Sequence, residues 1–240
     1  MITKTIWLTG ASSGIGFEIA KQLLNLNVKL ILSSRNIENI RQTITKNTFD
    51  IKAKIFFCPI DLGVPSKIKE CYYYIINNIG EVDILINNAG KFISKNFLNT
   101  TLEQYNEIMN VNLQGAFITT KCVLPSMISH KKGIIVNINS IVALQTFPYC
   151  AIYSASRAGF LAMMQSLREE VRKYGIKIIN VLPGATATNI WGKDITQANK
   201  NMMSSPYEIA KIVVDTLKLC ENTNSMIEEI IIKPQYGNID

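Results

Sequence analysis

Tyr153 and Arg157 are four residues apart in a segment whose pattern predicts a helix that begins at Tyr153, so their side chains share one helical face. A phenol with an ordinary pKa of about 10 is a poor base at neutral pH, but a nearby cation favours the phenolate. Arg157 supplies a cation that does not give up its proton. The pair could therefore hold a charge beside a phenol that moves a proton.

A glycine-rich turn could bind phosphate. The residues Gly10-Ala11-Ser12-Ser13-Gly14-Ile15-Gly16 follow an apolar run and open directly into an amphipathic helical pattern. Gly10 permits a tight turn, Gly14 lets backbone approach a pyrophosphate, and Gly16 allows the helix to pack closely on the strand. The helix N-terminus adds free N–H groups and a positive dipole end. Glycines also serve plain loops, but the position between a first strand and a first helix favours phosphate binding.

The remaining chain alternates short apolar, β-branched runs with longer helical patterns, which is typical of βαβ units and a parallel sheet. We expect strands over Thr5–Thr9, Lys29–Ser34, Lys54–Pro59, Ile84–Asn87, Gly133–Ile138, Lys177–Leu182 and Glu229–Lys233. We expect helices over Ile15–Leu26, Ile37–Lys46, Ser66–Asn78, Thr101–Ser129, Tyr153–Tyr174 and Pro206–Leu219. These seven strands predict an α/β fold, a three-layer sandwich with a doubly wound parallel sheet. The aperiodic stretch Ala185–Ser205 is a candidate active-site lid.

Composition limits the class of protein. With 240 residues, of which 48% are apolar, the chain can supply one large core, so residues 1–240 are expected to form a single domain. Apolar runs such as Ile134–Ile138 are far shorter than the roughly 20 residues that cross a bilayer, and the N-terminus lacks the pattern of a signal peptide. We therefore expect a cytoplasmic protein without a membrane partner. The net charge of +7 is scattered along the chain, so no nucleic-acid surface is expected.

The cysteines and the single histidine point to no metal centre. The cysteines are widely spaced and form no C-x-x-C motif, which favours free buried thiols over disulfides or a metal site. They are Cys58, Cys71, Cys122, Cys150 and Cys220. His130 follows a predicted helix and is expected to be an exposed residue of its last turn.

Together with the glycine turn, further motifs resemble the short-chain dehydrogenase/reductase family in its common single-domain form. They are Asn87-Asn88-Ala89-Gly90, Asn112, Ser140, Tyr153-Ser154-Ala155-Ser156-Arg157 and Pro183-Gly184. The resemblance extends from Thr5 to about Lys233 and implies a Rossmann-like, seven-stranded fold. It also implies an oxidoreductase that uses NAD(H) or NADP(H), without a metal, to interconvert a small-molecule carbonyl and an alcohol.

In this family Tyr153 would be the general acid/base, Ser140 would hydrogen-bond the substrate oxygen, and Asn112 would hold a water and its helix. Ser140 and Asn112 could instead be structural, because Ser is common in turns and Asn can bond locally. Arg157 stands where the family has lysine and would bind the nicotinamide ribose beside Tyr153. Its guanidinium is bulkier and forked. A catalytically weakened dinucleotide-binding sensor or scaffold is therefore the alternative to an enzyme.

The end of the second strand predicts the cofactor. An acidic residue there would bind the adenosine ribose of NAD(H), whereas an arginine accommodates the 2′-phosphate of NADP(H). The chain has Ser34 and Arg35 at this point and no carboxylate, which favours NADP(H) over NAD(H). Ser12, Ser13 and Ser34 are possible supporting donors. Arg35 could also be an ordinary solvated loop residue.

The resemblance assigns further residues to the cofactor. Asp61 and Leu62 follow the third strand, where the family holds adenine, although Asp61 could merely cap the turn before Gly63. Asn88, Ala89 and Gly90 could contact the cofactor or fix the central loop, and both roles stay open. Contacts to the carboxamide and pyrophosphate are expected from Pro183, Gly184, Thr186 and Thr188.

The substrate pocket and the assembly are less specific in the sequence. Candidate pocket residues are Phe147, Tyr149, Cys150, Trp191, Met202 and Met203, which suggest an apolar or aromatic carbonyl compound. Trp191, Met202 and Met203 could equally pack against the body of the protein. The helical patterns Thr101–Ser129 and Tyr153–Tyr174 correspond to those through which family members associate. We therefore expect a homotetramer or a homodimer.

Overall fold

The computed structural model describes residues 4–46, 51–191, 196–197, 200–221 and 223–237, and within these ranges a seven-stranded parallel sheet forms the centre of the molecule. The strand order is β3-β2-β1-β4-β5-β6-β7. The strands are β1 (Thr5–Thr9), β2 (Lys29–Ser33), β3 (Lys54–Phe57), β4 (Ile84–Asn87), β5 (Gly133–Ile138), β6 (Ile176–Pro183) and β7 (Glu229–Ile232). This confirms the predicted parallel sheet, with strand ends that differ from the expected ones by at most two residues.

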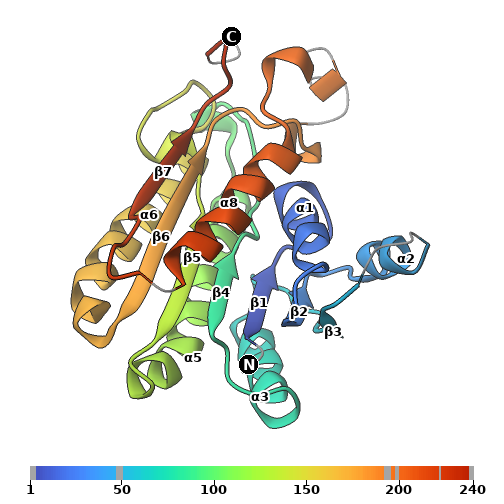
Figure 1. Ribbon diagram of the computed structural model, residues 1–240. Coiled ribbons are helices and arrows are strands. Elements are labelled where there is room, and N and C mark those ends of the chain that lie inside the picture. The colour runs from blue at the N-terminus through green and yellow to red at the C-terminus, as the bar shows by residue number, and fades with distance from the viewer. Residues whose placement is uncertain (1–3, 47–50, 192–195, 198–199, 222, 238–240) are drawn as a thin grey trace.

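Helices cover both faces of the sheet (Figure 1). One face carries α1 (Gly14–Leu23), α2 (Glu38–Lys46) and α8 (Pro206–Cys220), and α1 packs on α8. The other carries α3 (Pro65–Asn78), α5 (Gly115–Ser129) and α6 (Ala151–Val171), with α4 (Leu102–Met109) beside α6. The architecture is the three-layer, Rossmann-like sandwich that the sequence predicts. No helix among the described residues is long and apolar enough to cross a bilayer.

The period of two along each strand divides the core into two parts. In β1 the side chain of Trp7 enters the cluster under α3, α5 and α6, whereas Ile6 and Leu8 enter the cluster under α1 and α8. All three side chains are buried. Strands buried on both faces appear in sequence as continuous apolar runs, which is why their positions could be predicted.

A ladder of asparagines crosses the middle of this apolar sheet. Asn87, Asn137 and Asn180 are paired in register on β4, β5 and β6. The Asn87 amide nitrogen donates to the Asn137 side-chain oxygen, and the Asn137 nitrogen donates to that of Asn180, both at 3.0 Å. Thr119 of α5 donates to the Asn87 oxygen at 2.7 Å. The ladder holds the central strands in one register, because a one-residue shift would leave buried amides unpaired.

The predicted helix over Thr101–Ser129 is wrong in one respect, since the structure divides it. A capping box between Thr101 and Gln104 starts α4, and a π-helical segment, η2 (Asn110–Gln114), joins α4 to α5. An apolar period alone does not distinguish an α-helix from one that contains an extra residue in a wider turn. This segment carries Asn112.

Smaller differences concern helix ends and the aperiodic stretch. Tyr153 does not begin its helix, because α6 starts two residues earlier at Ala151, and α6 ends at Val171 before the 3₁₀ turn η4 (Arg172–Tyr174). His130 is the exposed C-cap of α5, as expected. The stretch Ala185–Ser205 contains the 3₁₀ turns η5 (Asn189–Trp191) and η6 (Lys200–Met202), and part of it lies outside the described residues.

Candidate active site

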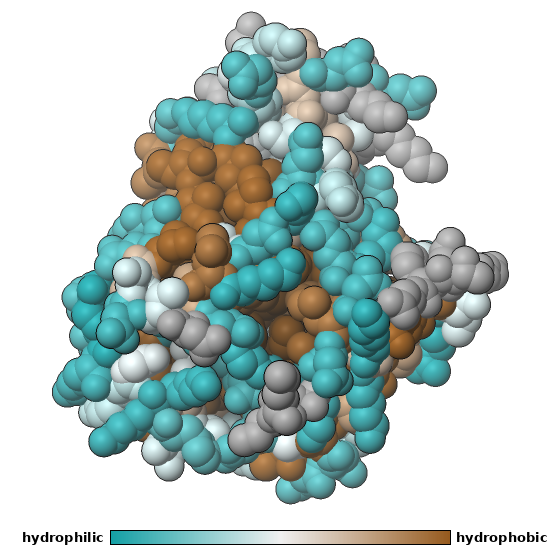
Figure 2. Space-filling view, viewed as in Figure 1, coloured by the Kyte–Doolittle hydropathy of each residue, from teal (hydrophilic) through white to brown (hydrophobic). Residues whose placement is uncertain are grey.

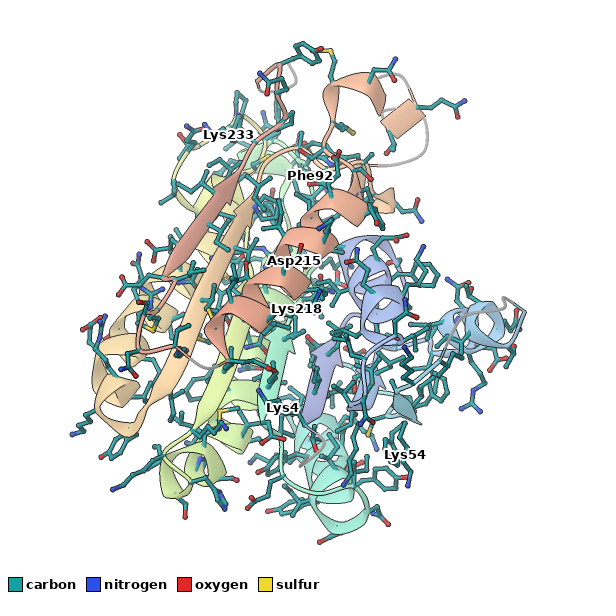
Figure 3. All side chains as sticks on the ribbon, in the orientation of Figure 1. Lys4, Lys54, Phe92, Asp215, Lys218 and Lys233 are labelled. Atoms are coloured by element: carbon teal, nitrogen blue, oxygen red, sulfur yellow. The ribbon has the colours of Figure 1, made fainter. Side chains whose placement is uncertain are left out.

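The candidate residues gather at the carboxyl edge of the sheet. Gly10 follows β1, Asn88 follows β4, Ser140 comes shortly after β5, and Gly184 follows β6. Parallel strands end at the same edge, and ligands of open α/β sheets bind there. In Figure 3 Phe92, which comes after β4, lies at this end of the molecule, whereas Lys4, which precedes β1, lies at the other.

The glycine turn is packed against the segment after β4. Gly10 has a φ of +69°, and a Cβ atom there would lie 2.7 Å from Cα of Ala89. A Cβ atom at Gly16 would lie 2.2 Å from the side-chain nitrogen of Asn88. This nitrogen donates to the carbonyls of Thr9 and Gly10, each at 3.0 Å. Asn88 therefore holds the turn to the sheet, which is the structural role considered for it from the sequence.

The N-terminus of α1 is open to a ligand. The N-cap Ser13 makes no side-chain hydrogen bond to the first turn, and no acidic residue lies in that turn. A helix start leaves its first backbone N–H groups without intrahelical partners. A Cβ atom at Gly14 would lie 3.1 Å from the methyl group of Thr188, so the segment after β6 passes close to this helix start. These donors fit a pyrophosphate.

Ser34 and Arg35 lie beside this turn at the end of β2. The Ala11 N–H donates to the Ser33 carbonyl at 3.1 Å, which joins the two segments. Ser34 is buried and donates to the Asn36 carbonyl at 2.8 Å. Arg35 is exposed and has no ion pair with any residue that the structure describes. A free guanidinium next to a phosphate-binding turn fits a second phosphate group.

Asp61 and Leu62 occupy the turn after β3. One carboxylate oxygen of Asp61 accepts from the Gly63 N–H at 2.9 Å, which is the turn-capping role weighed in the sequence. Leu62 is buried, and a Cβ atom at Gly115 would lie 2.9 Å from Cβ of Leu62. The turn is thereby fixed against α5.

Tyr153 and Arg157 are buried side by side. Their side chains are 7% and 4% exposed, and the guanidinium carbon of Arg157 lies 5.2 Å from the centre of the Tyr153 ring. Nη1 of Arg157 donates to the carbonyl of Ile138 at 3.2 Å. A Cβ atom at Gly90 would lie only 2.0 Å from Nη2, so this side chain uses the space that the glycine leaves. The cation and the phenol ring thus lie against each other in a part of the site that is largely shielded from water.

One nitrogen of this guanidinium lacks a partner. Nε of Arg157 is buried and forms no hydrogen bond with any described residue. An unpaired buried donor of a charged group costs free energy, about 1–3 kcal/mol or more. A ligand that brings an oxygen atom within hydrogen-bond distance of Nε would remove this cost.

Asn112 joins three segments of the site. Its amide nitrogen donates to the Lys91 carbonyl at 2.9 Å and to Oγ of Ser156 at 3.0 Å, and its oxygen accepts from the Lys91 N–H at 2.7 Å. It is 1% exposed. The π-helical segment thus holds the chain after β4 against α6, the helix that carries Tyr153 and Arg157.

Ser140 is the N-cap of the 3₁₀ turn η3 (Ile141–Ala143), which packs against α6. Its Oγ accepts from the Val142 N–H at 3.3 Å. The side chain is partly exposed, and its hydroxyl hydrogen has no acceptor among the described residues. It can therefore donate to an oxygen in the site.

The sequence did not identify Phe92. Its ring meets Tyr153 edge-on, with ring centres 4.9 Å apart, and lies 5.5 Å from the ring of Trp191. Nε1 of Trp191 donates to the Thr186 carbonyl at 3.1 Å, which fixes this aromatic group to the segment after β6. The available signal was position alone, since Phe92 comes two residues after Gly90.

The other pocket candidates divide by exposure. Tyr149 is 61% exposed and has a φ of +62°, an unusual value for a residue with a side chain. Met202 is exposed, whereas Met203 is buried and packs into the protein body. Among the residues expected to contact the cofactor, Thr186 is buried and donates to the Gly184 carbonyl at 3.0 Å. Pro183 is the last residue of β6.

Comparison with known proteins agrees with this arrangement. A family model described as "short chain dehydrogenase" matches residues 4–199. The mouse protein "Dehydrogenase/reductase SDR family member 7" is 32% identical over 231 residues, which cover 93% of this chain and 68% of that protein. The human protein of the same description is 35% identical over 189 residues, or 77% of this chain, and the match spans 56% of its length.

Solved structures agree as well. An alcohol dehydrogenase from Thermococcus sibiricus, complexed with 5-hydroxy-NADP, superposes with a TM-score of 0.88 at 24% identity and covers 99% of both chains, which establishes the fold. A metagenomic short-chain oxidoreductase in complex with NADP has a TM-score of 0.78 at 26% identity and covers 97% of both chains. The family model matches most of this chain. The chain therefore belongs to the short-chain dehydrogenase/reductase family of oxidoreductase enzymes.

Proposed function

We propose that the protein is an NADP(H)-dependent oxidoreductase that interconverts a small-molecule carbonyl and an alcohol, with Tyr153 as the general acid/base. The observation that carries this proposal is the buried pair of Tyr153 and Arg157 at the carboxyl edge of the sheet, with ring and guanidinium 5.2 Å apart. The pair places a permanent cation beside a group that can give or take a proton.

The nicotinamide ring of the bound cofactor would supply or accept the hydride. In the reduction direction Tyr153 gives its phenolic proton to the substrate oxygen, and Ser140 donates a hydrogen bond to the same oxygen. Arg157 stabilises the phenolate that remains and binds the ribose hydroxyls. A positioned proton donor of this kind contributes about 10²–10⁴-fold to a rate. Asn112 keeps α6 in place through its bonds to Lys91 and Ser156.

The preference for NADP(H) rests on Arg35 and Ser34. Arg35 is exposed beside the glycine turn, and the residues directly after β2, Ser34–Asn36, include no carboxylate, so a 2′-phosphate would meet a cation there. A family member in complex with NADP among the structural neighbours supports the same cofactor. The adenine would lie near Asp61 and Leu62, and the pyrophosphate at the N-terminus of α1.

Phe92 and Trp191 favour a substrate with an apolar or aromatic group. The Phe92 ring meets the Tyr153 ring, where a carbonyl compound must approach its proton donor, and the Trp191 ring lies against Phe92. Aromatic surface of this kind binds apolar groups and gives a polar sugar few hydrogen-bond partners.

The experiment that tests this function follows NADPH absorbance with a panel of aromatic aldehydes, aliphatic ketones and sugars. We expect turnover with the aromatic or apolar members and at least a hundredfold lower rate in Tyr153→Phe. Tyr174→Phe, a matched change in the turn after α6, should keep the wild-type rate. Turnover that survives Tyr153→Phe would refute the mechanism.

A second function, a dinucleotide-binding sensor or scaffold, is favoured by one observation. Part of the Arg157 guanidinium is engaged by the Ile138 carbonyl rather than by the phenol. Tight NADPH binding in calorimetry without turnover of any panel member would support this second function.

We further propose a cytoplasmic homodimer or homotetramer, built on one domain, that does not bind nucleic acid. The helices beside the predicted contact expose large apolar side chains, among them Leu102 and Phe117. The edge strand β7 exposes Ile231, and Figure 2 shows an apolar area over this strand on an otherwise mostly polar face. Light scattering at micromolar concentration measures the assembly, and a monomer mass would contradict it.

A further inference from the structure

Two cysteines far from Tyr153 in the sequence are adjacent in space. Cys58 follows β3, and Cys71 lies in the middle of α3. Their sulfur atoms are 2.7 Å apart, with the Cys71 thiol donating to Cys58. A disulfide bond has a length of about 2.05 Å, so its formation requires the two sulfurs to approach by only about 0.7 Å. Neither the carbonyl chemistry nor the cofactor uses these thiols.

The pair borders a surface pocket. A surface pocket of about 340 Å³ is lined by both cysteines together with Phe57, Pro59, Lys67, Glu70 and Tyr74. Lys67 and Glu70 form an exposed ion pair of 2.8 Å, and Tyr74 is 49% exposed. Each cysteine is itself largely buried. A small molecule can therefore enter the pocket, whereas a second protein thiol cannot readily approach the sulfurs.

The two thiols differ in reactivity. The hydrogen bond from Cys71 lowers the pKa of Cys58 against the effect of burial, so Cys58 is the more easily deprotonated thiol of the pair. The same hydrogen bond and burial raise the pKa of Cys71. Burial also raises the pKa of Cys122 and of Cys150. Cys58 is thus the preferred nucleophile, and Cys71 is placed to resolve the product.

We propose that Cys58 and Cys71 form a redox-active thiol pair that a small hydroperoxide converts into an intramolecular disulfide. The Cys58 thiolate attacks the outer peroxide oxygen, the O–O bond breaks, and the leaving oxygen takes a proton. The resulting sulfenic acid is attacked by the sulfur of Cys71, and its S–O bond breaks to release water. The two thiols lose two protons and two electrons, and the hydroperoxide is reduced to an alcohol, or to water if it is hydrogen peroxide.

The disulfide would fasten both ends of the segment that carries Asp61 and Leu62. A bond between positions 58 and 71 closes a short loop around the turn after β3. Such a closure restricts the unfolded chain more than the folded one, in which the sulfurs already meet. Oxidation should therefore stabilise the protein and keep this turn in the conformation that the structure shows. Any effect of the disulfide on cofactor affinity rests on the proposed function, whereas the formation of the disulfide itself does not.

Peptide mapping tests the pair directly. The purified protein is treated with hydrogen peroxide, free thiols are alkylated, and tryptic peptides are analysed by mass spectrometry without reduction. Lys67 and Lys69 separate the two cysteines, so the disulfide joins two different peptides. We expect this cross-linked species and free thiols at Cys122, Cys150 and Cys220. We also expect a rise in Tm on the order of 5 °C that dithiothreitol reverses.

A matched pair of variants separates the role of these thiols from general oxidation. Cys71→Ser should stop at the sulfenic or sulfinic acid of Cys58 and show no rise in Tm, whereas Cys220→Ser should behave as wild type. If Cys71→Ser does not fold, the map of the wild-type protein decides. Two free thiols at Cys58 and Cys71 after treatment, or a cross-link to another cysteine, would overturn the proposal. NADPH titration of the oxidised protein then tests the proposed adenine site separately.

Discussion

Replacing Gly90 by alanine is expected to displace the Arg157 guanidinium while leaving the fold intact. The added Cβ atom would lie 2.0 Å from Nη2 and 3.1 Å from Cζ of Arg157, far inside contact distance. The third neighbour, the Asn112 side-chain oxygen at 3.5 Å, is at ordinary contact distance. The end of a side chain yields more easily than backbone, so the guanidinium moves and loses its hydrogen bond to the Ile138 carbonyl.

The expected size of the effect follows from that bond. A hydrogen bond from a charged donor contributes about 1.5–3 kcal/mol. Losing a charged contact of similar strength to the transition state would lower kcat/KM by roughly ten- to a hundredfold. The displaced guanidinium should also lower the Tm by roughly 5 °C without unfolding the protein at room temperature. NADPH affinity should fall as well, because Arg157 would bind the ribose.

The assay measures kcat/KM for the best carbonyl substrate and the NADPH dissociation constant by calorimetry. Gly159→Ala is the matched control, since it makes the same change on the helix that carries Arg157, and its Cβ atom would lie 3.5 Å from Leu113, an ordinary contact. We expect the control to keep wild-type kinetics. A Gly90→Ala protein within twofold of wild type would refute the argument that the position of Arg157 matters, and an equal loss in both variants would refute its specificity.

Arg35, Arg157 and Arg168 give further predictions. NADPH should bind at least tenfold more tightly than NADH in calorimetry, and Arg35→Ala should remove this difference. The control Arg41→Ala, which removes another cation nearby, should leave the difference in place. An affinity ratio that Arg35→Ala does not change would count against the phosphate site. Arg157→Lys should leave kcat/KM unchanged or lower across the pH range in which tyrosine titrates, because lysine cannot fork; a tenfold gain, about 1.4 kcal/mol, would favour the binding protein instead. Burial raises the pKa of Glu229, but hydrogen bonds, one from Arg168, outweigh burial and hold it below its usual value of 4.5. Ionised Glu229 therefore stabilises the protein above pH 4.5, and this stability is lost as the pH falls through the lowered pKa. In thermal melts Arg168→Met should reduce both the Tm at neutral pH and the dependence of Tm on acid pH. Identical melting curves for variant and wild type would contradict this role of Arg168.

The strands could be predicted because their signal is local. Buried parallel strands such as Gly133–Ile138 form apolar runs between turn residues, and their limits follow from the residues themselves. The asparagine ladder could not be predicted in this way. Asn87, Asn137 and Asn180 become partners through the register of three strands that lie far apart in the chain. Each alone would be judged a polar interruption.

The candidate site shows the same division. The glycine turn and the spacing of Tyr153 and Arg157 were recognised from short segments, and their roles remain predictions. Phe92 and the contact between Cys58 and Cys71 arise only when separate elements pack together, and no local pattern marks them. The sequence predicts two roles for Asp61, and its hydrogen bond to Gly63 is the one of the turn-capping role.

The π-helical segment η2 makes the length of the connection between α4 and α5 as important as its composition. A wide turn contains one residue more than an α-helical turn requires. Deleting a single residue between Asn110 and Gln114 would replace the wide turn by a regular α-helical one. Asn112 would then be displaced from Lys91 and Ser156. Substitutions at the other residues of this stretch should therefore be tolerated better than a deletion, because only the deletion displaces Asn112.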